Sequence, residues 1–196
     1  MNIFLRYLVI FFNFFRCFPH LIIYYLHPDK NIINSDISVW LKSKGKKFSN
    51  TVGLIYLLGV FKEYRTLFYY RIGVSNYFLN IFCPKLPNLV INVIEEIGEG
   101  FYINHGFGTI IGAQSIGKFC RISQQVTVGE NFDKRPVILD NVSIASGAVV
   151  VGGITIGNNS VIGANSTVLT DIPDNSIVYP PRPIIMNWNK DRDKKN

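Results

Sequence analysis

Aliphatic residues recur at every sixth position over the second half of the chain. The longest run is Ile138, Ile144, Val150, Ile156, Ile162 and Val168, and an earlier run is Ile110, Ile116, Ile122 and Val128. A third short series, Ile97 and Ile103, stands one residue out of phase with the second. Six is neither the period of a helix nor that of a simple strand. The repeat predicts a parallel β-helix, in which each unit is a short strand plus a turn and three units close one triangular coil.

The turns of this β-helix carry residue types that suit tight corners. Glycine often follows the aliphatic residue, and small residues stand four places after it: Gly98, Gly117, Gly129, Gly157 and Gly163, with Ala148, Ser160 and Ser166. Asn158, Asn159 and Asn165 suit left-handed turn positions. At eighteen residues a coil, residues 97–172 predict about four coils.

The ladder breaks once, between Val128 and Ile138. The segment 129–137 is too long for a corner, so we expect it to loop out of the coil. It is either a tolerated insertion or a lid over a cleft between neighbouring subunits, because loops on rigid scaffolds commonly carry function.

The N-terminal segment is rich in aromatic residues. Residues 3–26 read IFLRYLVIFFNFFRCFPHLIIYYL, which is long enough to span a bilayer, but polar residues such as Arg6, Asn13 and Arg16 interrupt it. No small-residue cleavage site follows, which argues against a secretory signal. Since Arg6 and Arg16 lie close to one helical face, residues 1–29 are predicted to form an amphipathic segment lying on a membrane surface. A helix buried in an oligomer and a true span are the alternatives.

Residues 30–87 form a second zone, with apolar residues at helix-like spacing. They are Trp40, Leu41, Leu54, Leu57, Leu58, Phe61, Leu67 and Phe68, with a lysine-rich turn at 42–47 between them. The pattern predicts two or three helices within 30–82. Two prolines in 83–87 mark a boundary. We therefore assign 88–185 to the β-helix domain and 186–196 to a polar, charged tail.

Charge divides the chain in the same place. Residues 1–87 hold eleven Lys/Arg and three acids, a net charge of +8, whereas residues 88–196 hold nine Lys/Arg and ten acids, a net charge of −1. A basic, aromatic half favours contact with an anionic surface such as phospholipid headgroups. No recognition motif supports nucleic acid as a partner. The three scattered cysteines form no metal-binding spacing, so we expect no metal, and buried or neutral thiols of a reducing cytoplasm.

Several segments resemble the hexapeptide-repeat acyltransferases over roughly residues 88–185. They are 97–106 (IGEGFYINHG), 109–112 (TIIG), 122–129 (ISQQVTVG) and 162–166 (IGANS). Within that superfamily the chain is similar to the serine acetyltransferase branch and to its relatives in surface-polysaccharide gene clusters. The upstream string 63–73 (EYRTLFYYRIG) resembles the polysaccharide-linked relatives in particular.

The resemblance implies a left-handed coil and a homotrimer with active sites in the clefts between subunits. It also implies acetyl-CoA as co-substrate, with a histidine that removes the proton of the acceptor hydroxyl. His105 is the candidate, since imidazole titrates near neutral pH and His20 and His27 lie outside the repeats. A lone histidine is often structural, but the place of His105 in the motif favours catalysis. Asn104, where the family usually has Asp, is a candidate substrate-binding residue.

The chain departs from the serine acetyltransferase pattern at two places. Val90 and Asn92 stand where the pattern has an Asp–His pair, so the carboxylate that would orient the base is missing. Arg135 stands about where the pattern has its second histidine, and it is either a binding residue for an anionic group of the acceptor or a solvated loop arginine. A backbone carbonyl, Glu95 or Glu96 could orient His105 instead.

Relatives hold the pantetheine arm of acetyl-CoA against small residues on the coil faces. The matching positions here are Ser146 and Ala164, with Thr170 near the exit, although small residues are also needed at corners for structural reasons. Arg182 is a candidate for the nucleotide phosphates, in place of a lysine that the family usually has near this position.

Three functions fit these observations. The departures and the basic N-terminus favour an O-acetyltransferase acting on a hydroxyl of a sugar, or of a lipid-linked sugar, in capsule or O-antigen synthesis. Such an enzyme would be cytoplasmic, at the inner face of the membrane. The alternative is a serine O-acetyltransferase of cysteine biosynthesis, and a non-catalytic β-helix scaffold is the third reading.

Overall fold

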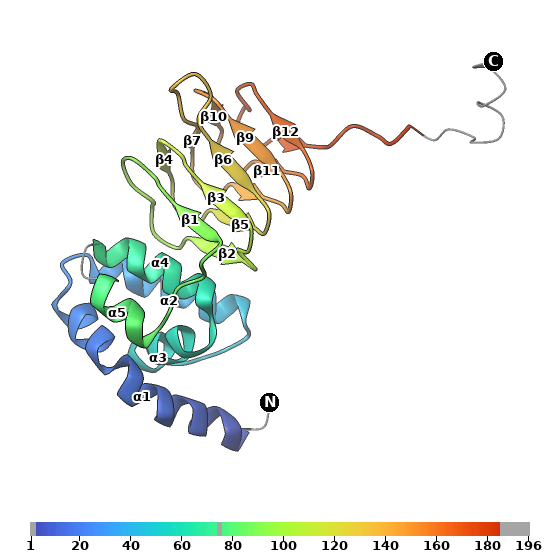
Figure 1. Cartoon of the computed structure of the whole chain (residues 1–196). Helices are drawn as coiled ribbons and strands as arrows, with labels where there is room; N and C mark the ends of the chain where they lie inside the picture. Colours follow the sequence, from blue (N-terminus) through green and yellow to red (C-terminus); the bar gives the residue numbers. More distant parts are fainter. Residues whose placement is uncertain (1–2, 74–75, 185–196) are drawn as a thin grey trace, which may run out of the picture.

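The computed structural model describes residues 3–73 and 76–184, so the predicted tail at 186–196 lies outside the described residues. Within these described residues, five α-helices packed together cap one end of a parallel β-helix (Figure 1). The helices are α1 (Ile3–Leu26), α2 (Lys30–Ser43), α3 (Asn50–Val60), α4 (Lys62–Ile72) and α5 (Asn76–Phe82). The predicted architecture, an α-helical region followed by a parallel β-helix, is confirmed.

The second zone contains four helices rather than two or three. Phe61 has an extended backbone between the end of α3 and the start of α4. The chain therefore forms two helices where the apolar spacing continues without a break. Gly73 then ends α4 at a φ of 63°, in the left-handed region. The predicted apolar residues are buried except Phe61, which is partly buried; Trp40, Leu54 and Phe68 are each no more than 1% exposed.

α1 lies on the side of the helical region that faces away from the β-helix (Figure 1). It packs against α3 and α5, and its His20 Nε2 lies 2.8 Å from the Tyr69 hydroxyl in the buried interior. The three cysteines are free and buried, as expected. No helix within 3–73 or 76–184 is both long and apolar enough to cross a bilayer.

A buried ion pair joins the helices to the first coil. Arg71 of α4 donates to Asp36 of α2 at 2.9 Å, and the two side chains are 8% and 2% exposed. Arg71 also donates to the carbonyls of Ile97 and Gly98, while Asp36 accepts from the Phe101 amide at 2.9 Å. Burial raises the pKa of Asp36, although Arg71 acts in the opposite direction. Each partner therefore bonds both the helices and the β-helix, which fixes how the two meet.

Three parallel sheets form the faces of the β-helix. The first contains β1 (Leu89–Ile91), β3 (Thr109–Ile111), β6 (Thr127–Gly129), β9 (Val149–Val151) and β12 (Thr167–Val168). The second contains β4 (Ser115–Ile116), β7 (Val137–Ile138) and β10 (Thr155–Ile156). The third contains β2 (Tyr102–Asn104), β5 (Arg121–Ser123), β8 (Ser143–Ile144), β11 (Val161–Ile162) and β13 (Ile177–Val178).

The predicted ladder forms the core, with one error and one extra coil. Five strands in the first sheet make five coils rather than four, because β1 begins the solenoid before residue 97. The inward position in β3 belongs to Ile111, which is fully buried, and not to Ile110, which is 48% exposed. The register pairs Ile103 with Ile122 and Ile111 with Val128. The two inward residues of this coil are therefore eight positions apart, whereas their partners one coil later are six positions apart. The corner after β2 is therefore two residues longer than its successor.

Corner residues behave as their types predict. Asn159 and Asn165 adopt φ of 55° and 58°, in the left-handed region. A Cβ on Gly117 would lie 2.7 Å from the Leu139 backbone, so only glycine lets the coils stack there. Segment 129–137 loops out as a short hairpin, in which Asn131 and Lys134 exchange backbone hydrogen bonds.

Candidate active site

His105 occupies the corner between β2 and β3, the corner with two additional residues. Its side chain is exposed, and its backbone has a φ of 60°. A left-handed conformation is unfavourable for a residue with a Cβ, and such strain recurs at functional sites. The longer corner therefore holds the one histidine of the β-helix within the described residues at the surface, where a substrate can reach it.

Three residues follow His105 along the same edge of the solenoid, one per coil. The strand register pairs Ile103, Ile122, Ile144 and Ile162, and the second residue after each forms a corner column of His105, Gln124, Ser146 and Ala164. The sequence-predicted residues Ser146 and Ala164 thus lie in line with the predicted base. Their small side chains leave an uncrowded edge along which an extended arm can lie.

Gln124 is a member of the corner column that sequence reasoning missed. It stands between His105 and Ser146, and its side-chain oxygen is buried without a hydrogen-bond partner among the described residues. A buried acceptor without a partner is costly, so a ligand donor at this point would be favourable. The ladder in the sequence could have identified Gln124, because the residue two positions after each inward aliphatic residue of this sheet belongs to the column.

Asn104 precedes the base at the end of β2 and pairs with Ser123 of β5. Its side-chain oxygen accepts a long hydrogen bond, 3.4 Å, from the Tyr102 hydroxyl. The guanidinium of Arg121 lies 5.0 Å from the centroid of the Tyr102 ring. Lys44 Nζ lies 5.7 Å from the same centroid, so two cations stand over this ring near His105.

Glu63 is a second residue near the base that sequence reasoning missed. It lies in the first turn of α4, and its Cγ is 3.3 Å from the point where a Cβ of Gly106 would lie. Gly106 follows His105 directly. The Glu63 side chain forms no hydrogen bond or ion pair with another described residue, which leaves its carboxylate available beside the corner. Glu63 begins the string 63–73 that resembles the polysaccharide-linked relatives, but nothing in the sequence indicated that it lies next to residue 105.

Glu95 and Glu96, the acids that the sequence suggested as partners of His105, lie elsewhere in the chain. Both stand at the corner between the first and second sheets, whereas His105 stands between the third and the first. Glu95 accepts a hydrogen bond of 2.7 Å from Gln114. Val90, at the place of the missing carboxylate, is 47% exposed on β1. Within one chain, neither acid is placed to orient the imidazole.

Arg135 and Thr170 lie at the corner between the first and second sheets, away from His105 in the same chain. Arg135 donates to the Asn92 carbonyl at 2.9 Å and to Glu130 at 3.2 Å. Arg182 follows β13 on the extended segment that leaves the solenoid (Figure 1). The structure therefore groups Asn104, Ser146 and Ala164 with His105, and it places Arg135, Thr170 and Arg182 apart from it.

Metal-assisted chemistry gains no support from the side chains. In the part of the chain that the structure describes, no three His, Cys, Asp or Glu residues cluster as metal ligands.

The repeats match a known family. Residues 135–170 match the family model described as bacterial transferase hexapeptide (six repeats). That part of the β-helix is therefore similar to the hexapeptide repeat of bacterial transferases. A serine acetyltransferase of Bacillus pumilus (strain SAFR-032) is 44% identical over 107 residues, which is 51% of this chain and 49% of that protein. One of Synechococcus elongatus is 36% identical over 117 residues, 57% and 48% of the two chains. The chain thus spans about half the length of the curated relatives it matches.

Solved structures agree with this similarity. Serine acetyltransferase isoform 3 of Entamoeba histolytica, in complex with cysteine, gives a TM-score of 0.57 at 26% identity, covering 85% of this chain and 64% of that chain. The serine acetyltransferase of Neisseria gonorrhoeae gives 0.62 at 23% identity, covering 84% and 69%, and supports the fold alone. The comparisons show that the chain is similar to serine acetyltransferases, and they give no support to a polysaccharide-linked branch.

Proposed function

We propose that this protein is an acetyl-CoA-dependent O-acetyltransferase with His105 as its general base. The observation that carries the proposal is the exposed His105 at the head of the corner column, with small residues in line above it. The neutral imidazole takes the proton of the acceptor hydroxyl as that oxygen attacks the thioester carbonyl. The carbon–sulfur bond then breaks, and the proton passes to the departing CoA thiolate. Ser146 and Ala164 would lie along the pantetheine arm.

The site is proposed to form between the subunits of a homotrimer. His105 and the pair Arg135 and Thr170 stand at different corners of one solenoid, so a single chain cannot bring them together. Neighbouring solenoids in a trimer could place one kind of corner against the other. Arg135 would then meet an anionic group of the acceptor, and Thr170 and Arg182 would lie on the CoA side.

L-serine is the first acceptor to consider, because the relatives are serine acetyltransferases. This reverses the order favoured by the sequence. A sugar hydroxyl, free or lipid-linked, is the second candidate, and one observation favours it. Val90, Asn92 and Arg135 replace the Asp and the two histidines of the serine acetyltransferase pattern. These replacements change the acceptor side of the site and leave the corner column intact.

An acceptor panel tests the two candidates. Thiol release from acetyl-CoA should be measured with L-serine, free sugars, nucleotide sugars and lipid-linked sugars. Turnover that saturates with L-serine, and that is lost in His105→Ala, supports serine O-acetyl transfer. Saturation with a sugar alone would establish the second candidate. If no acceptor accelerates thiol release above the rate without protein, the chain is a scaffold and the proposal is wrong.

We infer that Glu63 positions His105 in place of the missing carboxylate. Replacing Glu63 with Gln should lower kcat by roughly 10- to 100-fold, less than removal of the base itself, because the imidazole loses its orienting charge. KM for acetyl-CoA should change little, since the corner column is untouched. Glu63→Asp should recover part of the loss. Steady-state kinetics of Glu63→Gln beside Glu95→Gln measures the difference, and equal effects of the two changes would contradict this role.

A further inference from the structure

One face of the helical region is apolar and uncovered within the described chain. Along α1, Phe11, Phe12, Phe15 and Phe18 are 62%, 65%, 68% and 52% exposed. α5 packs beside α1, with the Cys17 and Cys83 sulfurs 3.8 Å apart, and it exposes Ile81 by 76%. Water-soluble surfaces seldom carry this many exposed rings together, and such patches mark protein or membrane contacts. We call these exposed residues of α1 and α5 the aromatic face.

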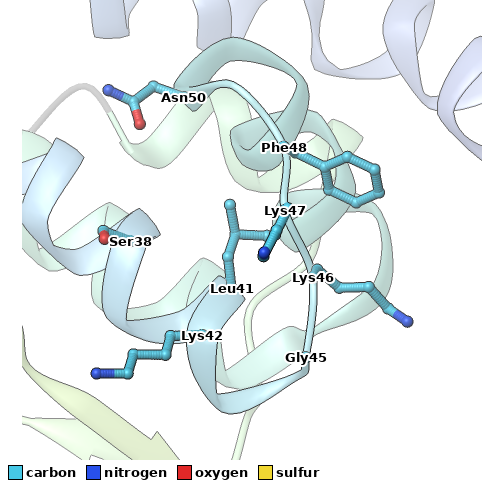
Figure 2. Close-up of a pocket in the computed structure, with 8 residues that line it drawn as sticks. All are labelled: Ser38, Leu41, Lys42, Gly45, Lys46, Lys47, Phe48 and Asn50. Atoms are coloured by element: carbon cyan, nitrogen blue, oxygen red, sulfur yellow. The ribbon is translucent and has the colours of Figure 1, made fainter.

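Lysines gather on the loop that leads from α2 into α3, the helix that packs against α1. Lys42, Lys46 and Lys47 line a surface cavity of about 610 Å³ at the loop between α2 and α3, and Figure 2 shows the side chains of Lys42 and Lys46 extending to opposite sides. The Thr51 hydroxyl at the start of α3 lies 2.6 Å from the Tyr25 hydroxyl at the end of α1. α3, which follows this loop, therefore lies beside α1, while Lys44 of the loop lies over the Phe61 and Tyr102 rings, 4.8 and 5.7 Å from their centroids. We call residues 42–48 the lysine loop.

The charges of this region are almost all of one sign. From residue 3 to residue 60 the acids are Asp29 and Asp36, and Asp36 is buried in its ion pair with Arg71. Lys30 lies over the Tyr25 ring, 4.3 Å from its centroid, beside the exposed Asp29. None of the lysines in the lysine loop forms an ion pair within the described residues. An occupant of this surface must accept apolar rings and supply negative charge next to them.

A second copy of this chain meets the first requirement and not the second, because it would bring the same lysines. A bilayer with anionic headgroups meets both. Amphipathic helices with aromatic residues on one side and cations nearby lie in the headgroup region, with the apolar face sunk roughly 5–10 Å. α1 fits this arrangement, since it is not apolar enough to cross a bilayer and lies on the side of the helices away from the β-helix (Figure 1).

We propose that the aromatic face and the lysine loop together dock the protein on the surface of an anionic phospholipid membrane. α1 lies in the plane of the bilayer, and the lysine loop contacts phosphate and other acidic headgroup oxygens. The β-helix then projects from the membrane into the aqueous phase, with the His105 corner beyond the helices. This proposal does not depend on the acceptor or on acetyl transfer.

Co-sedimentation of the full chain with vesicles tests the proposal. We expect binding to phosphatidylcholine vesicles that contain phosphatidylglycerol, weaker binding to phosphatidylcholine alone, and a decline as salt rises. Lys46→Gln with Lys47→Gln should weaken binding to anionic vesicles by roughly 20- to 30-fold, at about fivefold per lysine. Phe15→Gln with Phe18→Gln should weaken it by roughly tenfold or more per ring.

The matched control is Phe132→Gln with Lys134→Gln, an exposed ring and an exposed lysine on the hairpin of the β-helix. This variant should bind as the unaltered chain does. Circular dichroism establishes that each variant is folded, and light scattering reports its oligomeric state. The proposal is overturned if the unaltered chain ignores anionic vesicles, or if the control loses as much binding as the others. It is also overturned if the Phe15 and Phe18 changes dissociate an oligomer without altering vesicle binding, because the face would then be a subunit interface.

Discussion

Replacing His105 with alanine should lower the rate of acetyl transfer by about 10²- to 10⁴-fold, the contribution expected of a positioned general base. The hydroxyl must lose its proton as it attacks, and the described residues offer no other imidazole near the corner column. His20 is buried against Tyr69 within the helices, and His27 lies at the end of α1. Binding of acetyl-CoA should persist, because Ser146 and Ala164 remain.

The measurement is kcat for thiol release at saturating acetyl-CoA and acceptor, with the dissociation constant of acetyl-CoA taken separately by calorimetry. His27→Ala is the matched control, since it removes a histidine outside the β-helix and should leave kcat unchanged. A His105→Ala protein that binds acetyl-CoA but keeps most of its kcat would show that another group takes the proton. Loss of binding in that variant would instead assign His105 to the cofactor side.

The period of the ladder predicted the β-helix because inward positions are set by local geometry. Each coil repeats the same strand and corner, so an aliphatic residue at every sixth place is both visible in the sequence and buried in the structure. The same regularity explains the error at Ile110. Extra residues at the corner after Asn104 move the inward position from Ile110 to Ile111. Because both residues are isoleucine, the sequence does not show which of them points inward.

The phase slip in the ladder was the one sign of the active site that the sequence carried besides the histidine. A six-residue repeat that slips must lengthen a corner, and this one lengthens where His105 stands. The neighbourhood of Glu63 had no such sign. Its closeness to Gly106 depends on how α4 packs against β1 and β2, and that packing is set by contacts between residues far apart in the chain. The spacing of residue types along the sequence does not indicate such contacts.

The ion pair that sets this packing should be one of the most sensitive points of the fold. Replacing Arg71 with methionine leaves Asp36 buried without its cation, and breaking a buried pair from one side typically costs about 3–5 kcal/mol of unfolding free energy. The carbonyls of Ile97 and Gly98 also lose their donor. The loss should appear in urea denaturation followed by circular dichroism. Lys62→Met, an exposed change at the start of the same helix, should cost little.

The pH dependence of this loss has a definite sign. Burial already raises the pKa of Asp36 above its ordinary value, and Arg71 holds it down. Without Arg71 the folded-state pKa rises further, so the carboxyl stabilises the fold below its unfolded pKa and loses that contribution as pH rises through the folded value. The deficit of Arg71→Met should therefore be smaller in acid than at neutral pH. Adding Asp36→Asn should restore much of the stability at neutral pH, since no buried charge remains. A deficit that does not vary with pH, and that Asp36→Asn leaves unchanged, would mean that lost packing by the Arg71 side chain, rather than the stranded charge, sets the cost.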